Sequence, residues 1–216
     1  GNYNTVVGDE AGTAITTGDQ NTFVGYASGD ATTTAGQNTA LGYNALGANI
    51  TGAYNTGIGR NALLVTTGGS NTAVGGDALT ANTSGATNTA VGVSALAANT
   101  TAANNTGVGA NALTANTTGA SNVAVGAYTL DANTTANFNT AVGKQALTAN
   151  TTGGENTALG GQALMSNTTG GQNVSVGYYS LQSNTTGAEN VALGAYALDA
   201  NTTASYNTAV GYNAGT

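Results

Sequence analysis

Two glutamates, Glu155 and Glu189, are the residues of this sequence whose type and spacing could support acid–base chemistry. They stand two periods of a 17-residue repeat apart, and two strand spacings would separate them by roughly 9–10 Å. Inverting glycosidases hold two carboxyl groups about 6.5–9.5 Å apart, so polysaccharide hydrolysis is one hypothesis. Because the chain has no His or Cys, only carboxylates could transfer protons. Solvated surface acids are the better interpretation, and we predict that the chain is not an enzyme.

Tyrosines are the stronger candidates for binding. Exposed aromatic rings often bind sugars or become buried at protein interfaces, although ordinary surface residues of a strand-rich fold are the alternative. Four tyrosines share two neighbouring positions of the repeat within five successive copies, and we predict that they form a stripe for a host-cell or glycan receptor: Tyr128, Tyr178, Tyr179 and Tyr196.

Threonine pairs suggest a rival function. “NTTG” recurs through most of the chain, and regular rows of Thr at a strand spacing of about 4.8 Å suit an ice-binding face. Adjacent residues of an extended chain point to opposite sides, so only one Thr of each pair would face outward. An ice-binding β-solenoid is therefore the alternative function.

Composition excludes several classes of partner. The formal net charge is −7, and only two residues, Arg60 and Lys144, are cationic. A surface that neutralises nucleic-acid phosphates or anionic lipids needs many cations. No apolar run approaches the length that crosses a bilayer, and neither a Ca²⁺ loop nor a phosphate loop is present. We therefore predict no nucleic-acid partner, no membrane insertion, no metal and no cofactor.

A strict internal repeat organises the sequence. The motif N-[TV]-x-[VLI]-G recurs with a 17-residue period, which is shortened once, by a single residue, between Asn55 and Asn71. A disordered low-complexity segment has no reason to keep such regular phase. The repeats begin at Asn4, Asn21, Asn38, Asn55, Asn71, Asn88, Asn105, Asn122, Asn139, Asn156, Asn173, Asn190 and Asn207.

Positions of the repeat, numbered from this Asn, separate into constant and variable ones. Position four is aliphatic, position five is Gly, position eight is Ala, Ser or Thr, and positions nine and twelve are mostly Leu and Asn. All charged residues and all tyrosines occur at positions six, seven, ten, sixteen and seventeen. This segregation distinguishes the interior of a fold from its surface.

Short strands that stack on their own copies explain the pattern. We expect one strand over “NTAVG”, a second around “xALxA” and a polar bend at “NTTG”. The fold class is therefore an all-β parallel β-solenoid of 17-residue coils, and thirteen coils would span roughly 60 Å. Stacked amides can form hydrogen-bonded ladders, and the predicted ladder comprises Asn71, Asn88, Asn105, Asn122, Asn139, Asn156, Asn173 and Asn190. Position twelve is either a second ladder or a turn residue.

More than one chain is expected. Two large aliphatic side chains per repeat bury too little surface to offset the entropy of ordering the whole repeat. Position three is mostly Ala, Gly or Ser and is never charged. We therefore predict that positions two and four face the interior, whereas position three faces sister chains in a three-fold bundle. A monomer whose interior requires small residues at position three is the alternative.

The motif “NTAVGxxALxxNTTGxx” resembles the repeats of trimeric phage tail fibres and related bacterial surface proteins. “NTAVGYNAG” is more distantly similar to the head repeats of trimeric autotransporter adhesins. The resemblance spans the whole chain and implies a trimeric β-roll in an adhesive fibre. Because the coil is longer than that of the adhesin heads, the handedness of the winding stays open, and left-handed winding is one of the two possibilities.

These observations lead to one expectation. We expect residues 1–216 to form a single repetitive β-solenoid that is part of a longer fibre. Copies of the chain are expected to associate as a homotrimer and to assemble end to end. The fibre is extracellular, on a cell surface, as a free filament or as a virion tail fibre. Its function is structural and adhesive, with ice binding and polysaccharide degradation as alternatives.

Overall fold

The computed structural model describes residues 1–215, and every regular element in this range is a three-residue β-strand. Contacts divide the chain into two units, residues 1–105 and 106–216. The first unit contains β1 (Thr5–Val7), β2 (Thr22–Val24), β3 (Thr39–Leu41), β4 (Thr56–Ile58), β5 (Thr72–Val74) and β6 (Thr89–Val91). The second contains β7 (Thr106–Val108), β8 (Val123–Val125), β9 (Thr140–Val142), β10 (Thr157–Leu159), β11 (Val174–Val176), β12 (Val191–Leu193) and β13 (Thr208–Val210).

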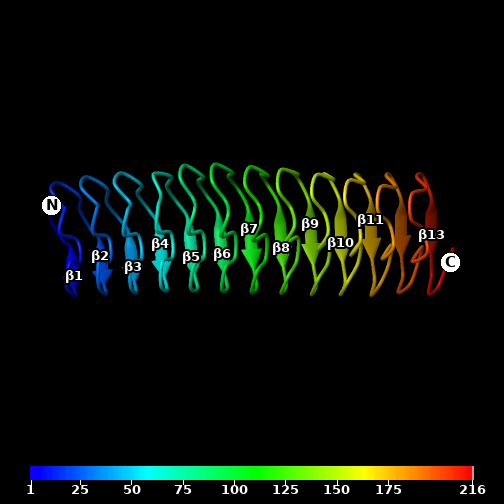
Figure 1. The fold of residues 1–216 in the computed structure, drawn as a ribbon, viewed down its shortest axis with the longest axis horizontal. Helices are drawn as coiled ribbons and strands as arrows, with labels where there is room; N and C mark the ends of the chain where they lie inside the picture. The colour runs from blue at the N-terminus through cyan, green and yellow to red at the C-terminus, as the bar shows by residue number, and fades with distance from the viewer. Residues whose placement is uncertain (216) are drawn as a thin grey trace. The chain divides into compact units, whose positions relative to one another are not determined.

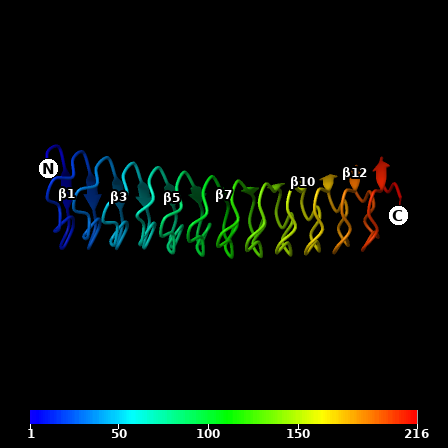
Figure 2. The same ribbon diagram turned by 90° about the horizontal axis from the view of Figure 1, so that it is seen from above.

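Within each unit, every strand pairs in parallel with the equivalent strand of the next coil. Thr140 of β9 lies opposite Thr157 of β10, and Val142 lies opposite Leu159. Figure 1 shows these strands side by side in each unit, and Figure 2 shows the bends that connect one strand with the next. The predicted parallel β-solenoid of 17-residue coils is confirmed. Residues 1–215 include no helix that is long and apolar enough to span a bilayer.

The second strand predicted around “xALxA” is wrong. This segment is a turn in both units, and the Leu of position nine has a left-handed backbone, for example φ of 53° at Leu147. A left-handed residue interrupts an extended chain, and for a residue with a Cβ it costs roughly 1–2 kcal/mol. The Leu side chains are nevertheless fully buried, so their burial offsets the cost of the turn.

The predicted sidedness of the strand is also wrong. Position three faces the interior, as shown by Ala141 and Ala158, which are fully buried. The neighbouring side chains of Val142 and Leu159 are 39% and 37% exposed. The reason is space, because Ala at positions three and eight, Leu at position nine and two Asn already fill a narrow interior. The small residues therefore meet the coil's own core.

Buried asparagines connect the coils and close them. The backbone N–H of Asn156 donates to Oδ1 of Asn139 in the preceding coil at 2.9 Å. Within one coil, Nδ2 of Asn139 and Nδ2 of Asn150 both donate to the carbonyl oxygen of Gly153, at 3.0 and 2.9 Å. Nδ2 of Asn150 also donates to Oδ1 of Asn133, at 3.2 Å. The Asn of position twelve thus forms a ladder of its own.

Hydrogen bonding of the interior is complete. In the part of the chain that the structure describes, no buried side-chain nitrogen or oxygen lacks a partner. This matters because an unpaired buried amide is costly. The asparagines of position one that the sequence singles out are all fully buried: Asn71, Asn88, Asn105, Asn122, Asn139, Asn156, Asn173 and Asn190.

Glycine at position five permits close stacking of the backbone. Gly143 has φ of 132°, and a Cβ added there would lie 2.5 Å from the carbonyl oxygen of Gly160 in the next coil. Both the backbone conformation and the contact therefore require Gly. This position directly follows each strand and directs the chain into the turn that carries positions six and seven.

The shortened coil omits one residue at an outer bend. Thr67 Oγ1 donates to the Thr83 carbonyl as position thirteen does elsewhere, and Asn55 Nδ2 donates to the Gly68 carbonyl as it would to position fifteen. The missing residue is therefore position fourteen, a Thr or Ser in the other complete coils. Buried contacts on both sides of the deletion are preserved.

Candidate functional surfaces

The first candidate surface is the outward side of the strands, which we call the sheet face. It consists of positions two and four, and in the second unit it includes Val125, Val142, Leu159 and Leu193, each between 36% and 39% exposed. Alternation along the strand places these side chains outside once Ala of position three is inside. No charged residue occurs at positions one to five in any copy of the repeat. The sheet face is thus apolar, repetitive and uncharged.

Threonines of the polar bend have two different roles. At position thirteen the hydroxyl groups stabilise the stack, since Thr134 Oγ1 donates to the Thr151 carbonyl at 3.2 Å, and Thr151 Oγ1 to the Thr168 carbonyl at 3.1 Å. Position fourteen is exposed, as at Thr135 and Thr152. The second threonine of each pair therefore forms an exposed row, whereas the first is half-buried at Thr134, Thr151 and Thr168.

The second candidate surface, which we call the tyrosine strip, lies just beyond the Gly turn of the second unit. The centroids of the Tyr178 and Tyr179 rings are 4.1 Å apart at an interplanar angle of 69°. Tyr179 stacks on Tyr196 of the next coil at 5.5 Å and 23°, and Tyr196 meets Tyr212 edge-on at 6.0 Å. Four rings from three successive coils therefore form one connected surface.

Only three of the four tyrosines chosen from the sequence belong to this strip. Tyr128 is 45% exposed, but it occurs three repeats before Tyr178 and Tyr179, and these ring contacts do not include it. Tyr212 joins the strip and was missed. The signal for it was present, because Tyr212 occupies position six, as Tyr178 does.

Contact with its neighbour changes the acidity of one ring. A hydrogen bond with Tyr179 and, to a lesser extent, desolvation raise the pKa of Tyr178 to about 12. Both effects favour the neutral phenol. Tyr178 therefore remains protonated over the whole physiological range, with its hydroxyl group engaged by Tyr179.

Amide side chains continue the same columns in the preceding coils. Gln162 Nε2 donates to Gln145 Oε1 at 3.1 Å across one coil boundary. Beside Gln162, the Tyr178 ring lies close to Gly161, because a Cβ added to Gly161 would be in ordinary van der Waals contact with Tyr178 Cδ2 at 3.4 Å. Glutamine amides and tyrosine rings are therefore contiguous at positions six and seven.

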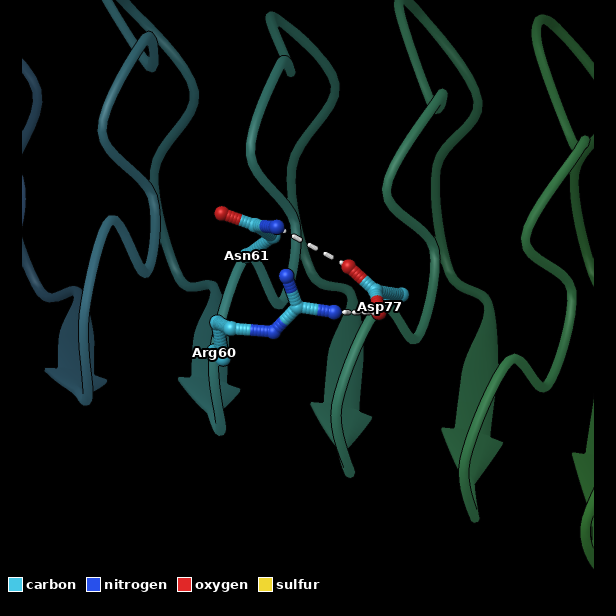
Figure 3. Close-up of polar contacts among 3 residues, drawn as sticks. All are labelled: Arg60, Asn61 and Asp77. Carbon is cyan, nitrogen blue, oxygen red and sulfur yellow. Dashed lines mark hydrogen bonds and ion pairs between the residues drawn. The ribbon is translucent and has the colours of Figure 1, made fainter.

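In the first unit the same columns carry an ion pair and a ring stack. Arg60 Nη2 lies 2.5 Å from Asp77 Oδ2, and Asn61 Nδ2 donates to Asp77 Oδ1 at 2.9 Å (Figure 3). The Arg60 side chain is 64% exposed, and such surface pairs contribute little to stability. Tyr26 and Tyr43 stack at 5.4 Å and 14°. Positions six and seven thus form cross-coil pairs in each unit.

A residue separates the two candidate catalytic carboxylates. Gln172 occupies the same column in the coil between those of Glu155 and Glu189, and its Nε2 donates to Glu155 Oε2 at 3.1 Å. Both glutamates are exposed. They are part of a solvated surface row in this structure, with no contact that would orient them toward a common substrate atom.

Comparison with known proteins adds no family assignment. No family model, no curated protein and no solved structure matches this chain. Within residues 1–215, neither unit contains a pocket, and no three acidic side chains gather closely enough to hold a metal ion. The fold itself therefore defines the class, a β-solenoid of 17-residue coils with two candidate binding surfaces.

Proposed function

We propose that the chain is a non-enzymatic structural segment of an extracellular adhesive fibre, in which copies of the chain associate through their sheet faces. One observation carries this proposal: the aliphatic residue of position four, constant in type through all copies, lies outside the coil. Val142 and Leu159 leave more than a third of their surface exposed. A large, contiguous apolar patch on a protein surface usually marks an interaction site.

Other copies of this chain are the partners that suit the face best. Its strands repeat at the same spacing in every copy, so two or three faces can pack with side chains in matching rows. Burying the exposed part of one Val or Leu contributes about 1 kcal/mol, and the second unit offers seven such rows. Three copies are the number that the resemblance to trimeric fibres implies. The extracellular location and the adhesive role rest on the same resemblance.

Charge placed on the sheet face tests the association. Sedimentation equilibrium of the wild-type chain should give a trimer, and the Val142→Lys, Leu159→Lys double variant should sediment as a folded monomer. The matched control is Gln145→Lys, Gln162→Lys, which adds the same charge beyond the Gly turn and should remain trimeric. A wild-type chain that stays monomeric and folded at micromolar concentration would refute the proposal.

A second function, ice binding, is favoured by the threonines of the same face. Position two is Thr in most strands. Thr140 lies opposite Thr157 in the paired strands, and Val142 lies opposite Leu159. The outward rows on the sheet therefore combine hydroxyl and methyl groups at a constant spacing. This row, and not the Thr-Thr pair of the bend, is the better candidate for an ice-binding surface.

The two functions exclude each other, because a trimer would bury the face that ice requires. Measurement of thermal hysteresis on the same samples distinguishes them. Hysteresis in a monomeric wild-type chain, abolished by Thr140→Lys with Thr157→Lys, would establish ice binding in place of self-association. If neither the wild-type chain nor the variant shows thermal hysteresis, ice binding is refuted.

A further inference from the structure

We propose that the tyrosine strip, Tyr178, Tyr179, Tyr196 and Tyr212, binds a neutral polysaccharide that lies along the stacking direction of the coils. The inference rests on the proposed adhesive function and names its ligand class. It depends on three properties of the strip: its ring geometry, its hydrogen-bonding groups and its lack of charge.

Ring geometry gives the strip an extended and directional form. Rings of successive coils meet edge-on, Tyr178 with Tyr196 at 5.9 Å and 88°, and Tyr196 with Tyr212 at 6.0 Å and 78°. Each step therefore advances by one coil over a distance comparable to the width of one pyranose ring. The C–H groups on the face of a sugar carry partial positive charge and are attracted to the negative face of an aromatic ring. A chain of sugars matches this periodic arrangement better than a single sugar does.

Hydrogen-bonding groups accompany the rings along the same columns. Gln145 and Gln162 precede the strip, and their side chains are half-buried and joined by a hydrogen bond. Tyr178 keeps its phenolic proton, and its ring is 48% exposed. Amides and phenols both donate and accept hydrogen bonds, which is the combination that sugar hydroxyl groups require. Apolar surface with a few polar groups that fix orientation is typical of ligand sites.

Charge selects among polysaccharides. Positions six and seven carry no ionisable group other than Tyr from Gly161 to Asn213, and the chain has a net charge of −7. A polyanionic glycan would be repelled by this net charge, and it would find no Arg to pair with its carboxylates or sulfates. A neutral chain of hexoses is therefore the ligand class that fits.

The strip is also separate from the surface proposed for self-association. The sheet face comprises positions two and four, whereas the strip begins after the Gly of position five, which turns the chain at the end of each strand. Burial of the sheet face in a trimer would therefore leave a different surface for the glycan. Occupancy of both surfaces at once is what an adhesive fibre requires.

Affinity electrophoresis in native gels tests the proposal. The probes are hydroxyethyl cellulose and galactomannan as neutral polysaccharides, with polygalacturonate as the anionic one. The wild-type chain should be retarded by at least one neutral probe and unaffected by polygalacturonate. The Tyr179→Ser, Tyr196→Ser variant, which lacks two of the four rings, should bind about tenfold more weakly, which corresponds to about 1.4 kcal/mol.

The matched control replaces the other stacked pair, Tyr26→Ser with Tyr43→Ser, and should keep wild-type retardation. Two results would overturn the proposal: no retardation of the wild-type chain by any neutral probe, or equal retardation of both variants and the wild type. Retardation by polygalacturonate alone is one form of the first result. Far-UV circular dichroism and thermal unfolding establish that each variant is folded.

Sedimentation of the same variants separates this inference from the proposed fibre. A strip variant that loses retardation while keeping the wild-type mass supports glycan binding by the strip. A monomeric wild-type chain that is still retarded would refute self-association and leave glycan binding intact. A trimer that no neutral polysaccharide retards would refute glycan binding and leave self-association intact.

Discussion

The ring of Phe23 fills the space that a side chain at Gly29 would occupy. A Cβ added to Gly29 would lie 2.5 Å from Phe23 Cδ2, and Phe23 is fully buried. In the next coil the same two positions hold Ala40 and Leu46, both fully buried. Positions three and nine therefore share one interior volume, filled from one side by Phe or from the other by Leu.

This exchange predicts a strong coupling between the two positions. Phe23→Ala should destabilise the chain by about 3–5 kcal/mol through the cavity it leaves, and Gly29→Leu by about 1–3 kcal/mol through overpacking. The double variant restores the Ala and Leu pair of the next coil, so it should be more stable than Phe23→Ala alone. Urea unfolding of all four proteins measures the coupling. Additive effects would contradict the shared volume.

Adjacent glycines should respond very differently to a methyl group. Gly75 has φ of 139°, and an added Cβ would lie 2.4 Å from the Gly92 carbonyl oxygen, whereas nothing lies within 4 Å at Gly76. Gly75→Ala should therefore lower the free energy of unfolding by at least ~1–3 kcal/mol. Gly76→Ala should change it by no more than about 0.5 kcal/mol. Chemical denaturation decides the matter, and similar values for the two would contradict the stacking of position five.

At Leu147, replacement by Gly should be no worse than replacement by Ala. Both remove the buried side chain, at about 2–5 kcal/mol for Ala, but Gly also relieves a left-handed backbone with φ of 53°. The control is Ala146→Gly, next in sequence and also buried, which should cost up to about 1 kcal/mol. If thermal unfolding shows Leu147→Gly clearly less stable than Leu147→Ala, position nine is not strained.

Removal of one ladder amide should be costly. Oδ1 of Asn156 accepts the backbone N–H of Asn173 at 3.0 Å, and its Nδ2 donates to the Gly170 carbonyl at 2.9 Å. Asn156→Ala leaves the buried backbone N–H of Asn173 without this partner, at ~1–3 kcal/mol, whereas the Gly170 carbonyl keeps its hydrogen bond from Asn167 Nδ2 at 2.9 Å. Thr152→Ala, at an exposed position of the bend, should stay within about 0.5 kcal/mol of wild type. Equal unfolding midpoints for the two variants would show that the ladder is not needed for stability.

Alkaline pH should weaken the region around the tyrosine strip. The pKa of Tyr178 is raised from 10.0 to about 12, so folding favours the neutral phenol. Its contribution to stability is complete below pH 10 and is lost as the pH rises toward 12. Tyr178→Phe should therefore reduce the loss of stability in this window, as followed by circular dichroism. Ultraviolet titration should also show one fewer late-ionising tyrosine in the variant.

Much of the fold could be predicted because the constant length of the repeat determines the register in which successive coils stack. In-register stacking requires like residues at a constant interval, and Asn139, Asn156 and Asn173 follow one another at the same 17-residue spacing. The parallel pairing of β9 with β10 and of β10 with β11 follows directly. Burial of Leu147 and Leu164 could also be predicted, because no charged residue occurs at their position.

Sidedness could not be predicted because both sides of the strand are uncharged. Ala141 and Val142 differ in volume more than in polarity, and the usual expectation that the larger residue is inside fails here. The interior is too narrow for Val at a position that already faces Leu147. The left-handed Leu residues were also missed, because Leu itself rarely adopts positive φ, although Gly12, Gly29 and Gly215 at the same position were a signal for it. The membership of Tyr212 in the strip was visible only as a shared position.

The coil that omits position fourteen has a practical consequence for engineering. Its hydrogen bonds at Thr67 and Gly68 match those of the full-length coils, so the length of the bend can change there while these hydrogen bonds are kept. The corresponding sites near Thr135 and Thr152 are therefore natural points for grafting foreign peptides. An array of such grafts would be displayed at a fixed nanometre-scale repeat.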